Sequence, residues 1–259
     1  MQRTARVGDW LELERELDRW ADSKQPVTLW WRDDDAARQS PALKRLLALS
    51  DSFEVPLGLA VVPAAMTPEF AASLPSLDCR VQVLQHGFEH RNNAGENEKK
   101  TEFGEHRPMP VVRDEIARGA ELLKSAAPDH FLSMFVPPWN RISKPALSAL
   151  PDLGFQSVST FGPRKSAWAA PNLRRLNTHV DLIDWRCGRR GKLAERVVDD
   201  LVGHLQARRC GDIAEPTGIL SHHFAHDEQC WEVLDRLFVV TRKSASVRWL
   251  RPGDAVNWG

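Results

Sequence analysis

The sequence predicts an α/β protein built around a parallel β-sheet. About seven short apolar segments alternate with helical patterns along the 259 residues, as in repeated βα units. The run 57–62 is apolar throughout, as expected for a strand that is buried on both faces of a parallel sheet. No Pro- or Gly-rich linker, shift in composition or internal repeat divides the chain, so we expect a single domain over 1–259.

The predicted elements follow one another in a regular order. An amphipathic pattern predicts an N-terminal helix over 9–22. Strands are predicted, in chain order, at 27–31, 57–62, 81–84, 131–136, 155–160, 177–182 and 218–220. Helical patterns such as 112–123 and 193–205 lie between them, and another follows the last strand. The polar segment 91–109 has no periodicity and is predicted to be a long loop.

Charge and composition limit the expected partners. Lys plus Arg and Asp plus Glu both total 35, so no net field attracts nucleic acid or an anionic membrane. The basic cluster at 186–192 contains no interleaved aromatic residue and is interpreted as a solvated loop. The sequence shows neither a signal-peptide pattern nor an apolar stretch long enough to span a bilayer, and we expect a cytoplasmic location. Free thiols are expected because no Cys-x-x-Cys spacing occurs among Cys79, Cys187, Cys210 and Cys230.

Unusual polar residues follow most of the predicted strands. Asp33, Asp34 and Asp35 come directly after the first strand, where like charges would repel one another unless a cation were near. Taken alone, such a run can also form a turn or a helix N-cap. Further polar groups follow later strands, at 85–90, 137–141, 184–186 and 221–223. Chemistry in α/β folds gathers where the carboxyl ends of strands meet, so this repetition favours a shared site.

The histidines at the third strand end favour a metal ion. His86 and His90 are spaced by four residues, which in one helical turn would place both imidazoles on one face. Asp35 or Asp34 would supply a third ligand. Two histidines and one carboxylate leave coordination positions open, as a catalytic ion needs, and zinc suits imidazole ligands. The other aspartate could then act as general base toward the attacking water.

The histidines at the seventh strand end favour a proton donor. His222 is the natural group to protonate a leaving amine. His223 would face the opposite way in extended backbone, and both it and His226 are interpreted as local hydrogen-bonding or helix-capping residues. A second metal site at His222 and His226 is an alternative.

These residues resemble five short motifs of the polysaccharide deacetylases, carbohydrate esterase family 4, whose NodB-homology domain is a distorted (β/α) barrel of about seven strands. The resemblance covers the chain from about Val27 to Trp231. The segments that are similar to the family motifs, in chain order, are Asp34-Asp35, His86 with His90, Pro137-Pro138-Trp139, Asp184-Trp185 and Leu220-Ser221-His222.

The resemblance implies a catalytic barrel over about 26–240 and leaves 241–259 as a C-terminal extension. It implies Asp34 and His222 as catalytic residues, and Asp35, His86 and His90 as metal ligands. The implied substrate-binding residues are Pro138, Trp139, Asn140, Arg141, Asp184 and Trp185.

Two positions depart from the family pattern. Val136 stands where the family usually has an arginine that orients the base, and Arg32, Arg141 or Arg186 could replace that arginine. His223 replaces the aspartate that usually follows the last motif's histidine.

The three aspartates also leave the register open. Asp33-Asp34 is the alternative functional pair, although Ala36 favours Asp34-Asp35. With Asp34-Asp35 as the functional pair, Asp33 would face outward or pair with Arg32. Trp30 and Trp31 could either line the site or fill the core.

The sequence therefore predicts a zinc-dependent hydrolase that removes an N-acetyl group from an amino sugar or glycan precursor and releases acetate. The expected partner is a carbohydrate or another small N-acetylated compound. One alternative is a metal- or glycan-binding relative that has lost catalysis. Another is a hydrolase of a non-sugar amide or imide.

Overall fold

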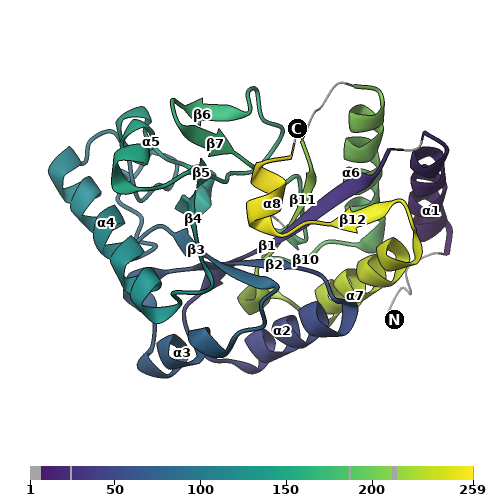
Figure 1. Ribbon diagram of the computed structural model, residues 1–259, viewed down its shortest axis with the longest axis horizontal. Coiled ribbons are helices and arrows are strands. Elements are labelled where there is room, and N and C mark those ends of the chain that lie inside the picture. The colour runs from purple at the N-terminus through teal and green to yellow at the C-terminus, as the bar shows by residue number, and fades with distance from the viewer. Residues whose placement is uncertain (1–6, 24, 187, 212–214, 259) are drawn as a thin grey trace. The chain divides into compact units, whose positions relative to one another are not determined.

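Strand β1 (Val27–Ala36), which ends in the aspartate run, is shared by two structural units of the chain. Unit 1 comprises Met1–Arg32, Pro41–Leu57 and Thr178–Gly259, and unit 2 comprises Asp33–Ser40 and Gly58–Asn177. The computed structural model describes residues 7–23, 25–186, 188–211 and 215–258 (Figure 1). The prediction that the whole chain acts as one domain stays a prediction.

In unit 1, β1 belongs to a group of parallel strands, and its side chains within this unit are buried in the core. Strand β12 (Val247–Trp249) pairs parallel with β1, and β11 (Thr217–Ser221) separates β1 from β8 (Val180–Asp181), with which it pairs in parallel. The side chains of Trp30 and Trp31 are fully buried, so both tryptophans fill the core.

Among the described residues of unit 1, the α-helices are α1 (Val7–Asp22), α2 (Pro41–Phe53), α6 (Ala194–Arg209), α7 (Glu228–Lys243) and α8 (Pro252–Val256). Helix α1 lies beside α6 (Figure 1), and Arg209 of α6 donates a 2.7 Å hydrogen bond to the buried carboxylate of Glu16. The segment 241–259, predicted as an extension, includes the end of α7 and contributes β12 and α8.

In unit 2, the strands follow the order β6-β7-β5-β4-β3-β2. Their bounds are β2 (Leu57–Val61), β3 (Val81–His86), β4 (Phe131–Val136), β5 (Ser157–Val158), β6 (Trp168–Ala170) and β7 (Leu173–Arg175). The pairs β3–β4, β4–β5 and β5–β7 are parallel, and the β6–β7 pair is antiparallel. The predicted α/β class with a mainly parallel sheet is therefore confirmed.

Three α-helices belong to unit 2: α3 (Pro68–Ser73), α4 (Met109–Ala126) and α5 (Lys144–Ala149). Helix α4 runs along β3 and β4 (Figure 1), and its apolar face, including Ile116 and Leu123, is buried. Segment 91–108 forms neither helix nor strand, as predicted, apart from a bridge between Phe103 and Ile142.

Two predictions from composition can be compared with the structure. Cys79, Cys210 and Cys230 are free thiols, while Cys187 lies outside the described residues. Within the described ranges, no helix combines the length and the apolar character that a membrane crossing requires.

Candidate metal centre

Asp35, His86 and His90 come together in unit 2, at the ends of β1 and β3. One ligand atom from each lies within 4.8 Å of the other two. The Oδ1 atom of Asp35 is 3.1 Å from Nε2 of His86 and 3.3 Å from Nε2 of His90. The structure therefore groups the three residues that the sequence predicts as metal ligands.

The orientation of His86 is set by the neighbouring strand. His86 is paired in register with Val136 of β4, and its Nδ1 lies 3.0 Å from the Val136 carbonyl oxygen. A carbonyl only accepts, so Nδ1 carries a proton, and in the neutral form of the ring the bare lone pair of Nε2 faces Asp35. This arrangement, with a backbone carbonyl behind the ligand, is typical of metal-binding histidines.

The donor set fits a divalent cation. In this tautomer the acceptor atom Nε2 of His86 faces a second acceptor, the Asp35 carboxylate, at a distance of 3.1 Å. Two lone pairs so close repel each other unless a proton or a metal ion lies between them. Two imidazole nitrogens and one carboxylate oxygen are also the ligand set of many catalytic sites that leave positions open for water and substrate.

His90 reaches the cluster by a route that the sequence did not predict. The segment 87–90 is not a helical turn: Gly87 and His90 both have left-handed backbone, with φ of 59° and 55°. The expectation of a helical turn between the two histidines is therefore wrong, although their convergence is confirmed. Burial, followed by the influence of His86, lowers the pKa of His90 and favours the neutral ring that a metal needs.

The three aspartates differ in exposure. Asp33 is fully buried and Asp34 is 2% exposed, whereas 35% of the Asp35 side chain is exposed. The expectation that Asp33 could face outward is therefore wrong. Asp35 also has left-handed backbone (φ 73°), which an aspartate tolerates better than most residues and which is often found at functional sites.

Trp139 lies directly beside the cluster. Its ring centroid is 4.5 Å from that of His90, and the side chain is partly exposed. Trp139 and Asn140 follow the buried Pro138 and both have left-handed backbone, with φ of 54° and 56°. The guanidinium of Arg141 donates to the Lys100 carbonyl in loop 91–108. Substrate binding by these residues stays a prediction.

A second polar group, in unit 1, surrounds His222 after β11. The ring of Trp185 lies edge-on to that of His222 at 4.7 Å, and the Trp185 indole donates to Oδ2 of Asp181 at 2.8 Å. Burial raises the pKa of the Asp181 carboxyl, while the charge of His222 lowers it. Sequence reasoning missed Asp181; its only signal was its place in the alternating segment 177–182.

The other residues near His222 make contacts within unit 1. Asp184 accepts a hydrogen bond from the amide of Arg186, and Asp227 caps α7 by accepting from the amide of Cys230. His223 is buried, and His226 packs edge-on against Trp231. The catalytic role of His222 and the substrate-binding roles of Asp184 and Trp185 stay predictions.

His179, His204 and Glu215 form another candidate cluster in unit 1, but its geometry does not fit a metal ion. Nδ1 of His179 accepts from the Gly218 amide, so the proton of the neutral ring is on Nε2, which faces Glu215 at 3.1 Å. The two histidine rings are stacked, with 26° between their planes, so their in-plane lone pairs do not converge. Burial, followed by His179 and Arg208, lowers the pKa of His204 to about 3. We interpret this group as a buried polar cluster.

The fold defines the structural class of the chain: it is the α/β fold of the polysaccharide deacetylases. The chain matches a protein described as a polysaccharide deacetylase from Mycobacterium smegmatis with a TM-score of 0.62, at 14% identity and 90% coverage of both chains. It matches a peptidoglycan N-acetylglucosamine deacetylase with a TM-score of 0.56, at 14% identity and 90% coverage of both chains.

A third structure, a family 4 acetyl xylan esterase from Clostridium thermocellum in complex with a cobalt ion, matches with a TM-score of 0.54, at 15% identity over 89% of this chain and 90% of the other. The same fold occurs in a CE4 family pseudoenzyme from Bacillus anthracis (TM-score 0.53, 13% identity, 89% of this chain and 66% of the other). The sequence matches no protein-family model and no curated protein. The resemblance seen in the sequence is thus confirmed at the level of the fold.

Proposed function

We propose that this protein is a metal-dependent deacetylase that hydrolyses an N-acetyl amide on an amino sugar or glycan precursor and releases acetate. The observation that carries the proposal is the convergence of Asp35, His86 and His90: Oδ1 of Asp35 lies 3.1 Å from Nε2 of His86 and 3.3 Å from Nε2 of His90. The fold shared with a peptidoglycan N-acetylglucosamine deacetylase supports the substrate class.

Asp35, His86 and His90 would hold the ion, and we propose zinc as that ion. A divalent cation held there acts as a Lewis acid on the acetyl carbonyl and makes a water molecule more acidic. Asp34, next to the ligand Asp35 in β1, would take the proton of the attacking water. Trp139 offers an apolar ring face beside His90, against which a sugar ring can pack.

His222 would protonate the departing amine. Its support is the resemblance of Leu220-Ser221-His222 to the last family motif. Within unit 1, the ring of Trp185 lies edge-on to His222 at 4.7 Å, and its indole donates a hydrogen bond to the buried Asp181.

The proposal is tested by measuring acetate release by the zinc-loaded protein from a panel of N-acetylated sugars and oligosaccharides and their O-acetylated counterparts. Replacing the base, Asp34→Asn, is expected to lower kcat by about 10²- to 10⁴-fold while the metal content is unchanged. Asp129→Asn, which removes an exposed carboxylate from unit 2, is the matched control and should leave kcat unchanged. Acetate release from O-acetylated sugars alone would correct the substrate class to an ester.

A second candidate is a metal- or glycan-binding protein without catalysis. It is favoured by Val136 at the place of the family's arginine and by the pseudoenzyme that shares the fold. This candidate predicts that zinc binds, that no compound in the panel releases acetate, and that Asp34→Asn changes nothing that is measured. Acetate release that depends on Asp34 would contradict it.

A further inference from the structure

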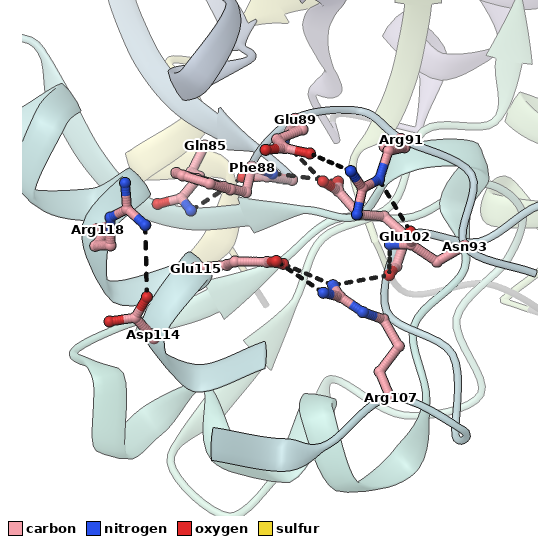
Figure 2. A network of polar contacts seen from close by, with 11 residues as sticks. Gln85, Phe88, Glu89, Arg91, Asn93, Glu102, Arg107, Asp114, Glu115 and Arg118 are labelled. Carbon is pink, nitrogen blue, oxygen red and sulfur yellow. Dashed lines mark hydrogen bonds and ion pairs between the residues drawn. The ribbon is translucent and has the colours of Figure 1, made fainter. Parts of the chain in front are cut away.

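Glu102, in the loop between β3 and α4, holds the segment that joins the two histidines. Its side chain is buried although the surrounding loop is polar. Its carboxylate accepts a hydrogen bond at Oε1 from the Glu89 amide (2.7 Å) and at Oε2 from the Phe88 amide (3.2 Å), as Figure 2 shows. Burial raises the pKa of the Glu102 carboxyl, and the hydrogen bonds from the Glu89 and Phe88 amides oppose that shift because they favour the ionised carboxylate.

The two amides need this partner because of the backbone that brings His90 to the cluster. Left-handed φ angles at Gly87 and His90 take the segment out of both strand and helix, so no regular ladder can accept from the amides between them. The rest of the segment is tied separately: the Gly87 amide donates to the Val136 carbonyl, and the Phe88 carbonyl accepts from the Ala64 amide, each at 3.0 Å.

Gly87 and Glu102 are sterically matched. A Cβ atom added at Gly87 would overlap Oε2 of Glu102 and would lie 2.6 Å from Cγ of Pro138. A side chain at this position would therefore displace the carboxylate. The absence of a side chain at Gly87 lets Glu102 approach both amides from the side of the turn.

Glu102 is itself fixed by loop 91–108 and α4. Its carbonyl oxygen accepts from the side chain of Asn93 at 2.9 Å and from Arg107 at 3.4 Å. Arg107 in turn makes two hydrogen bonds to Glu115 of α4, at 2.6 and 2.7 Å (Figure 2). The next residue, Phe103, is fully buried against Phe135 of β4. The carboxylate is therefore presented to the amides by a rigid support.

We propose that Glu102 is a positioning residue for the metal centre: it fixes the turn that sets His90 at the right distance from His86 and Asp35. This inference rests on the proposed metal site. Outer-shell groups of this kind typically change metal affinity by about 10- to 100-fold when they are lost.

The test compares the wild type with Glu102→Ala, Glu102→Gln and a control, Glu105→Gln, which removes an exposed carboxylate from the same loop. Zinc affinity is measured by competition with a chromophoric chelator, and the visible spectrum of the cobalt-loaded protein reports the coordination. Glu102→Ala should bind zinc at least about tenfold more weakly and show an altered cobalt spectrum. Glu102→Gln, which keeps one acceptor oxygen, should lie between, and the control should equal the wild type.

Amide hydrogen exchange of the metal-free proteins separates positioning from a general loss of stability. Glu102→Ala should accelerate exchange at Phe88 and Glu89 while the strand amides of β3 stay protected. Zinc affinity within twofold of the wild type in folded Glu102→Ala or Glu102→Gln would overturn the role of Glu102. A wild type without measurable zinc affinity would instead overturn the metal centre itself.

Discussion

The Nδ1 atom of His86 lies 3.0 Å from the carbonyl oxygen of Val136, its register partner on the neighbouring strand. This contact selects the tautomer with the proton on Nδ1 and leaves Nε2 for the ion. In the metal-free protein, nitrogen NMR should therefore show a protonated Nδ1 for His86. Zinc should shift the Nε2 resonance and leave the Nδ1 proton in place; loss of that proton signal on zinc binding would contradict the assignment.

Gly87→Ala should destabilise the protein more than Gly154→Ala, the same substitution at another glycine with left-handed backbone. Both Gly87 (φ 59°) and Gly154 (φ 84°) have backbone that an alanine adopts at a cost of about 1–2 kcal/mol. A Cβ at Gly154 would meet no atom within 4 Å, whereas one at Gly87 would overlap Glu102. In urea denaturation, Gly87→Ala should lower the free energy of unfolding by at least about 1 kcal/mol more than Gly154→Ala, since overpacking typically costs about 1–3 kcal/mol. Equal losses of unfolding free energy would show that the side chains around Gly87 move aside to make room for the added methyl group.

The ion pair between Arg107 and Glu115 should stabilise unit 2, whereas the one between Arg118 and Asp114 should not. The first is 10% and 15% exposed and bidentate, and the second is 60% and 64% exposed with a separation of 3.6 Å. Double-mutant cycles to alanine should give a coupling energy of about 1–3 kcal/mol for the first pair. For the exposed pair on the same helix, the coupling should stay below about 0.5 kcal/mol. Similar values for both pairs would contradict this view of loop 91–108 as a rigid support.

Stability should fall in acid because His204 is buried in its neutral form. Its pKa is about 3 in the folded protein against 6.5 in an unfolded chain, so the unfolded state binds the extra proton first as the pH falls below 6.5. This one group should lower the free energy of unfolding by up to about 1.4 kcal/mol for each pH unit between 6.5 and 4.5. His204→Asn, which can keep the hydrogen bond to Thr217, should have the shallower slope over this range. Equal slopes would show that His204 is protonated in the folded protein.

Local patterns were sufficient to predict where the candidate metal ligands come together. Strand ends follow from short apolar runs, and polar residues at those ends, such as Asp35 and His86, stand out against the runs that precede them. The grouping of Asp35, His86 and His90 could therefore be predicted without the structure. The full burial of Asp33 could not, because the structure extends β1 through Ala36, beyond the predicted end of the strand.

The path between the two histidines could not be predicted either. A spacing of four residues is compatible with a helical turn and with a left-handed bend, and the choice depends on a contact with Glu102, which is distant in sequence. Glu102 lies in a polar loop without periodicity, so no local signal distinguishes it from the exposed Glu105. Asp181 was missed because it lies inside the alternating segment 177–182, where nothing in the sequence marks its side chain as the partner of Trp185 four residues later.

The central claim is that Asp35, His86 and His90 bind one divalent metal ion. The most direct test is zinc binding to the purified wild type and to Asp35→Ala and His86→Ala, with the exposed His106→Ala as control. The wild type and the control should bind one zinc ion per chain. Each ligand variant should bind zinc more than about 100-fold more weakly than the wild type, which is a larger loss than removal of an outer-shell group causes. Unchanged zinc affinity in both ligand variants would contradict the account.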